Sequence, residues 1–202
     1  MNESALDTIK RFVAGHITPQ EFRDRLYNDD TFETLLTNDP DLTPSNYVFS
    51  SGSAYHFVIA QNYDDPGGVL SAQGALCDFM DRNNIDYSKT DRYSDLYDLI
   101  LDAQPEWLAV ESQYVADQIM PHAGNRSGSE LQQWLASEFR ARFRYIDQPP
   151  KWIQSPNWPI GENGPLVFLG QLDIKDYLHD DAAAYVFHDQ QSGCCETIIQ
   201  VY

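Results

Sequence analysis

The strongest constraint on the fold lies between Pro149 and Ile174, where a segment rich in proline and tryptophan leads into an apolar run. Five prolines fix their own φ angles and disfavour helix in the residues before them, so this segment is predicted to be extended. The apolar run Leu166–Ile174 is then predicted to be a strand. Gly161 and Asn163-Gly164 should form the turn that precedes it, because both residue types tolerate positive φ.

Two tryptophans of this segment, Trp152 and Trp158, are expected to pack as large amphipathic plates against the sheet. The alternative is that they line a groove that binds a peptide or a protein. The architectural interpretation follows from the rigid prolines around them, which hold both rings next to the predicted strand.

Helical patterns dominate the chain before this segment. Thr18 and Pro19 form an N-cap and a first helical residue, and Gly15 has the position of a left-handed stop after the preceding helix. Helices are predicted around residues 6–13, 19–26, 32–36, 69–83, 91–103 and 106–120, with a further one capped by Ser129. Residues 47–60 contain β-formers, but periodicity does not separate a short hairpin from a buried helix there.

Strands are predicted after the helices, at Leu166–Ile174, Ala183–His188 and Thr197–Tyr202, with a hairpin turn at Gln190–Gly193. The order of elements predicts an α+β fold, with a helical N-terminal half followed by a small, mostly antiparallel C-terminal sheet. We expect a helical region over residues 1–145 and a β-rich region over 146–202, packed together as one unit.

Acidic residues are concentrated in the middle of the chain. The whole sequence has 31 acidic and 13 basic residues and a net charge of −18, which opposes binding to nucleic acid. Residues 61–120 hold 12 acidic and 3 basic residues, a local balance of −9. Such a field attracts a basic protein and speeds its encounter, although solubility alone would also account for an acidic composition.

Four aspartates within that region have helical spacing. Asp91, Asp95, Asp98 and Asp102 recur at i, i+4, i+7 and i+11, so they should share one narrow face of a helix. This stripe is either a solvated helix face or a docking surface for a cationic partner, with Tyr87 as an aromatic anchor beside it. The acidic pair Asp64 and Asp65 fits a turn, and we include it with the stripe among the candidate partner-binding residues.

Catalytic and metal-binding patterns are weak. His179, His188, Cys194 and Cys195 offer donors that zinc accepts, but their spacing matches no familiar site, so we expect no metal, no cofactor and no catalytic residues. No apolar run approaches the roughly 20 residues that a membrane span needs, and the start lacks a secretory pattern. The sequence therefore predicts a cytoplasmic, non-enzymatic protein with reduced thiols, and leaves its oligomeric state open.

Two parts of the chain resemble known families. The matching positions of the proline-rich segment are Trp152, Gln154, Pro156, Trp158, Pro159, Pro165, Leu166, Phe168, Leu169, Gly170, Gln171 and Asp173. They resemble a pattern of the YwqG-like family of bacterial proteins, where it stands at the entry to a β-rich domain. The helical start, from Leu6 through Phe22 to Leu36, is similar to immunity proteins encoded beside bacterial polymorphic and contact-dependent toxins.

Some of those immunity proteins join such a start to a YwqG-like end. The combination implies an immunity protein that binds the C-terminal domain of a cognate toxin and covers its active or substrate-binding surface.

Overall fold

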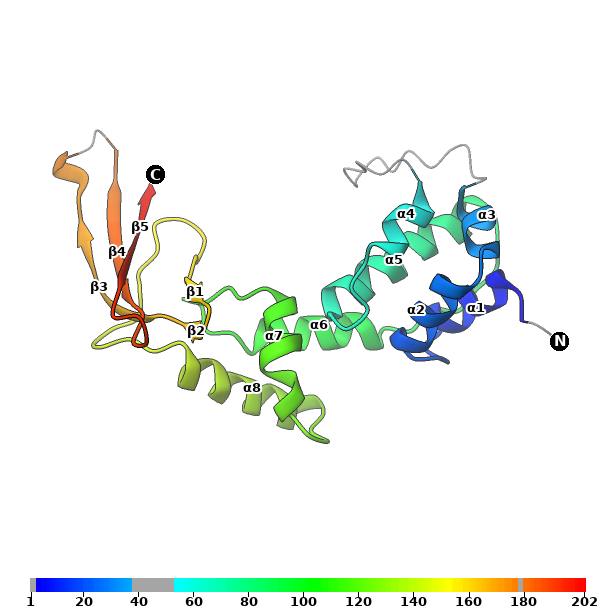
Figure 1. Cartoon of the computed structure of the whole chain (residues 1–202), viewed down its shortest axis with the longest axis horizontal. Coiled ribbons are helices and arrows are strands. Elements are labelled where there is room, and N and C mark those ends of the chain that lie inside the picture. Colours follow the sequence, from blue (N-terminus) through cyan, green and yellow to red (C-terminus); the bar gives the residue numbers. More distant parts are fainter. Residues whose placement is uncertain (1–2, 38–52, 178–179) are drawn as a thin grey trace. The chain divides into compact units, whose positions relative to one another are not determined.

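The computed structural model describes residues 3–37, 53–177 and 180–202, and it has an α+β fold (Figure 1). Helices occupy most of the N-terminal half, and an antiparallel three-stranded sheet with a small two-stranded sheet lies in the C-terminal part. The chain divides into two compact units, Met1–Asp98 and Leu99–Tyr202. These units do not coincide with the regions 1–145 and 146–202 that the sequence indicated, since α7 and α8 belong to the same unit as the sheet.

The first unit is helical. Its helices are α1 Ala5–Val13, α2 Pro19–Asn28, α3 Thr31–Thr37, α4 Ala54–Ile59 and α5 Pro66–Arg82, followed by the beginning of α6 Arg92–Asp102. The predicted cap of α2 is confirmed, because the Thr18 hydroxyl accepts a hydrogen bond from the Glu21 amide and Pro19 opens the helix. Gly15 follows α1 with a φ of 73°, as the expected left-handed stop requires.

The region predicted as either hairpin or helix is helical where the structure describes it. Residues 54–59 form α4, whose N-cap Ser53 accepts a hydrogen bond from the His56 amide. A hairpin over residues 47–60 is therefore wrong for its second half, and residues 47–52 lie outside the described part of the chain.

Aromatic rings fill the centre of the first unit. Phe12 stacks on Phe22 with ring centroids 4.3 Å apart, and both rings contact Tyr63. The hydroxyl of Tyr63 donates to the Val58 carbonyl, so the ring enters the core without leaving a polar group unpaired. Gly68 permits a close approach here, because a Cβ at that position would lie 2.2 Å from the Asn62 carbonyl oxygen.

A buried glutamine joins three parts of this core. The Gln73 side chain of α5 donates to the Val13 carbonyl at 3.0 Å and to the Thr90 carbonyl at 2.9 Å. Gln73 is fully buried, and its bonds satisfy the carbonyl of buried Val13 and that of partly buried Thr90. They hold the end of α1 and the residues before α6 against α5.

We expect Gln73→Leu to lower the free energy of unfolding by about 1 kcal/mol, since the Thr90 carbonyl loses its donor while the Val13 carbonyl keeps only the Thr90 amide. Urea unfolding followed by circular dichroism measures the change. Ser71→Ala, at a half-exposed position on the same helix, is the control and should change stability by about 0.5 kcal/mol or less. Equal stability of the Gln73 variant and the parent would contradict the assigned role.

The second unit combines helices with the sheet. Its elements after α6 are α7 Ser112–Gln118, the 3₁₀ turn Met120–His122, α8 Gly128–Arg142, β1 Ile160–Gly161, β2 Gly164–Pro165, β3 Val167–Asp173, the 3₁₀ turn Lys175–Tyr177, β4 Ala182–His188 and β5 Cys195–Val201. The three long strands are antiparallel in the order β3-β4-β5, so β5 forms one edge (Figure 1). The predicted turn lies between β1 and β2, where Gly164 has the expected positive φ, 117°, whereas Gly161 and Asn163 do not have positive φ.

Two helix starts differ from the prediction. The helix expected from Glu106 begins only at Ser112, because the Gln104 side chain bonds both backbone groups of Val110 and closes a loop there. The expected cap Ser129 lies inside the first turn of α8, which begins at Gly128.

Trp152 and Trp158 are part of the core of the second unit. The indole of Trp158 is 5% exposed, and its N–H donates to the Leu166 carbonyl at 2.9 Å. The half-exposed Trp152 ring lies 4.5 Å from Tyr185 between centroids, and its N–H donates to the Trp107 carbonyl. Phe143 and Phe187 contact Trp158 edge-on, so these aromatic rings join the end of α8 to the sheet.

Candidate functional site

The predicted acidic stripe follows one helix. Asp95, Asp98 and Asp102 lie on α6, and Asp91 precedes it, where its carbonyl accepts from the Asp95 amide and begins the helical hydrogen bonding. All four side chains are exposed, and within the described part of the chain none of them forms an ion pair. Like charges at i+3 and i+4 repel one another, so the stripe slightly destabilises its own helix.

A small pocket in the first unit lies beside the start of this helix. It has a volume of about 200 Å³. Its lining comes from α2, the loop before α5, α5 itself and α6, and includes Gln20, Asp64, Val69, Arg92, Tyr93 and Leu96. The structure thus brings Asp64 to the same pocket as the first turn of α6, although 28 positions separate Asp64 from Arg92.

Charged and polar groups form one side of this pocket. Asp64 accepts from the Arg23 guanidinium at 3.1 Å and from the Gln20 amide at 3.0 Å. Arg92 lies over the Tyr93 ring, 5.8 Å from its centroid. Sequence reasoning missed Gln20 and Arg92, because only the packing of α2 and α6 brings them to Asp64.

Tyr93 and Tyr87 are held by the core beside the stripe. Tyr93 is 5% exposed, its hydroxyl donates to the Phe12 carbonyl, and burial raises its pKa. Tyr87 packs partly buried against the core, and its pKa is raised by burial and by hydrogen bonding with Cys77 and Asp81. Tyr87 therefore offers a partner only part of its ring rather than a free aromatic anchor.

Asp65 has a structural role that the sequence analysis left open. Its carboxylate accepts from the amides of Gly67 and Gly68, both at 3.1 Å, and so caps the N-terminus of α5. Both carboxylate oxygens are used in this cap, whereas the neighbouring Asp64 faces the pocket.

The alternative groove at Trp152 and Trp158 stays a prediction, and the two rings differ in exposure. Trp158 is buried, whereas Trp152 is half-exposed and lies 4.5 Å from Tyr185 between ring centroids, so only Trp152 could offer part of its ring to a ligand. A larger pocket of about 610 Å³ lies elsewhere in the second unit, between α7, the end of α8 and the β1–β2 turn, and is lined in part by Arg142 and Arg144. Because Arg142 pairs with Glu138 at 3.1 Å and Glu162 also lines the pocket, its charges are largely balanced.

The zinc-compatible donors do not form a metal cluster in the part of the chain that is described. His188 and Cys195 face each other across β4 and β5, with the sulfur 3.9 Å from Nδ1, and Cys194 is exposed in the turn. No group of three His, Cys, Asp or Glu side chains that could hold a metal ion occurs among residues 3–37, 53–177 and 180–202, and His179 lies outside them. Over the same ranges no helix combines the length and the apolar character needed to cross a membrane.

Comparison with known protein families, with curated proteins and with solved structures gives no match for this chain.

The adjacent aspartates should respond differently to substitution. We expect Asp65→Ala to lower the free energy of unfolding by about 0.5–2 kcal/mol, because the cap of α5 is lost. Asp64→Ala removes an exposed ion pair with Arg23 and an exposed hydrogen bond from Gln20, and should cost about 1 kcal/mol or less. Thermal and urea unfolding of both variants measure the difference, and a larger loss for Asp64→Ala would contradict these assignments.

Proposed function

We propose that this chain is a cytoplasmic, non-enzymatic immunity protein that binds a basic bacterial toxin domain and covers its active or substrate-binding surface. The observation that carries the proposal is the row of four exposed aspartates along α6, none of them ion-paired among the described residues. The resemblances of the chain's two ends to immunity and YwqG-like sequences support the same class of function.

The stripe favours a cationic partner for an electrostatic reason. Four carboxylates at helical spacing repel one another in the free protein, and basic side chains of a partner would relieve that repulsion on binding. The net charge of −18 also raises the rate of encounter with a positively charged protein. Both effects weaken as salt is added, because the stripe is exposed and salt screens it.

The pocket beside α6 would add specificity to this attraction. Its volume of about 200 Å³ suits one partner side chain. Val69 and Leu96 offer apolar contacts, while Asp64 at the rim can accept a hydrogen bond from a basic or polar end. In such an interface a buried anchor contributes most of the affinity, and the charges around it steer and orient the partner.

Reversal of the stripe tests the proposal. We expect the variant Asp91→Lys, Asp95→Lys, Asp98→Lys, Asp102→Lys to weaken binding of the upstream-encoded toxin domain by about a hundredfold or more and to abolish protection in co-expression. Titration calorimetry at low and moderate salt measures the affinity, and circular dichroism confirms that the variant is folded.

The matched control changes the same total charge at exposed acids outside the stripe and outside β5, with Glu106, Glu111, Asp147 and Glu162 each replaced by lysine. In this control variant the rate constant for association with the toxin domain should fall, while the rate constant for dissociation stays close to that of the parent protein. Equal losses in both variants would mean that net charge, and not the stripe, determines binding. Full protection by the stripe variant would reject α6 as the contact surface.

A further inference from the structure

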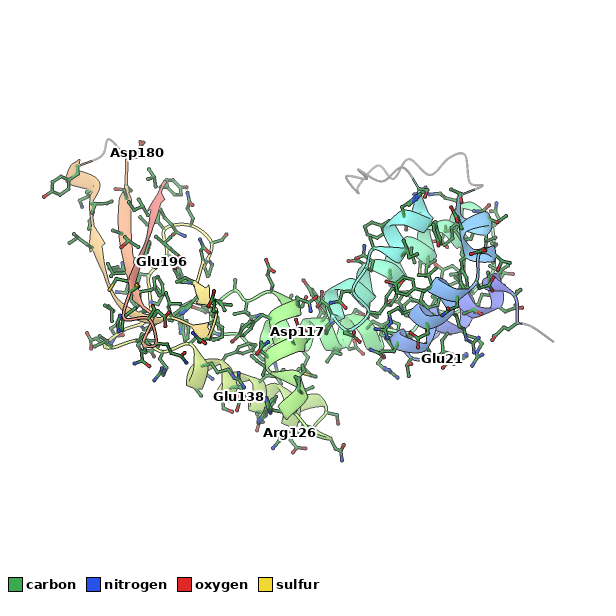
Figure 2. All side chains as sticks on the ribbon, viewed as in Figure 1. Glu21, Asp117, Arg126, Glu138, Asp180 and Glu196 are labelled. Atoms are coloured by element: carbon green, nitrogen blue, oxygen red, sulfur yellow. The ribbon has the colours of Figure 1, made fainter. Side chains whose placement is uncertain are left out.

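The edge strand β5 has the features of a pairing surface rather than of a protected edge. Natural sheets protect free edges with lysine, proline, bulges or very short strands. β5 is seven residues long, pairs with β4 without a register shift, and has Glu196 as its one charged residue (Figure 2). Its exposed side chains include Ile199 at 59% and Val201 at 37%.

The hydrogen bonds identify which backbone groups of β5 face outward. The Tyr202 amide donates to Asp181 and the Asp189 amide donates to Cys194, so the even-numbered residues of β5 exchange hydrogen bonds with β4. The N–H and C=O groups of Cys195, Thr197, Ile199 and Val201 therefore point away from the sheet.

Most of these outward groups have no partner. The Val201 carbonyl accepts from the Gln154 side chain at 2.5 Å, which closes the edge at that end. The backbone groups of Cys195, Thr197 and Ile199 form no hydrogen bond within the described part of the chain. The free edge is thus five residues long and centred on Thr197.

We propose that β5 pairs with β5 of a second copy, antiparallel, about a two-fold axis at Thr197. The free groups on each copy then match by symmetry, with Thr197 opposite Thr197 of the partner and Cys195 opposite Ile199. All of these groups gain hydrogen bonds, and the Gln154 contact with Val201 stays intact.

The charges of the strand agree with this register. Glu196 lies opposite Ile198 of the second copy and not opposite another Glu196, so like charges are not paired directly. Threonine opposite threonine is a favourable cross-strand pair. The proposal concerns only the sheet of the second unit and stands independently of any toxin.

The overall charge gives the dimer a characteristic salt dependence. Each copy has a net charge of −18, and these charges repel at low ionic strength, whereas the paired strands are almost neutral. Added salt screens the repulsion and leaves the backbone hydrogen bonds in place. Dimerisation should therefore strengthen with moderate salt.

Sedimentation equilibrium of the full chain over a range of concentrations tests the proposal. We expect the average mass to rise from 23.1 kDa toward twice that value as the protein concentration increases. When sodium chloride is added, this rise should occur at a lower protein concentration. A mass of 23.1 kDa at every concentration and salt level would overturn it.

Variants at the axis locate the contact. Thr197→Pro removes an outward N–H and leaves the bonds between β4 and β5 in place, so it should raise the dimer dissociation constant by about tenfold or more. Thr197→Lys keeps the N–H but places two lysines opposite each other in the dimer. It should therefore also raise the dimer dissociation constant. Circular dichroism of each variant checks that the sheet is retained.

The control is Leu172→Lys, on the same exposed sheet face but on β3, where the side chain is 62% exposed. It should leave edge pairing unchanged. A dimer that survives both Thr197 variants, or one that Leu172→Lys disrupts, would overturn the proposal, because the contact would then lie at the sheet face or elsewhere.

Discussion

A small polar network beneath the sheet determines how the second unit is built. The Tyr185 hydroxyl donates to the Lys151 carbonyl and accepts from the Ile153 amide, while the Gln200 side chain bonds the amides of Ile153 and Gln154 and the Ser155 carbonyl. Tyr185 and Gln200 are both buried, so removing either would leave polar groups unpaired away from water. The network holds the proline-rich segment against one face of the sheet, and the opposite face retains exposed Leu172 and Ile199.

The two proposed contact surfaces have opposite electrostatic character. The stripe on α6 is charged, exposed and weakened by salt, whereas the β5 edge is almost uncharged and its pairing is opposed only by the net charge of the whole molecule. The salt dependence of association therefore distinguishes the two interactions in the same protein sample. An association that weakens with salt belongs to the stripe, and one that strengthens belongs to the edge.

Sequence signals predicted those helix ends that are determined by interactions within a few residues. Thr18-Pro19 fixed the start of α2, and Gly15 fixed the stop before it, through hydrogen bonds and φ angles within a few residues. The start of α7 was missed because the Gln104 side chain, and not helical periodicity, determines residues 105–110. The helix at residues 54–59 could not be separated from a strand, since a short apolar run suits either one.

The candidate site was predictable only in part, for a similar reason. Helical spacing placed Asp95, Asp98 and Asp102 on α6 and Asp91 directly before it, but the role of Asp64 depends on distant partners. Asp65 is directed to the amides of Gly67 and Gly68, while Asp64 meets Arg23 and Gln20 from α2. Asp65-Pro66 is a local cap signal of the same kind as Thr18-Pro19, whereas nothing near Asp64 in the sequence indicates that its carboxylate will meet α2.

β5 contains few charged residues although the whole chain is strongly acidic, and this difference bears on its proposed role in pairing. The sequence contains 31 acidic residues, so a charged residue on an exposed edge strand would fit its composition. A charge at Thr197 or Ile199 would improve solubility and prevent pairing. Both positions are uncharged, although their side chains and backbone groups face solvent. An exposed edge of this kind invites uncontrolled association unless one defined contact covers it. Pairing about Thr197 is such a contact, because the Gln154 bond to Val201 leaves only five residues free and so restricts the register.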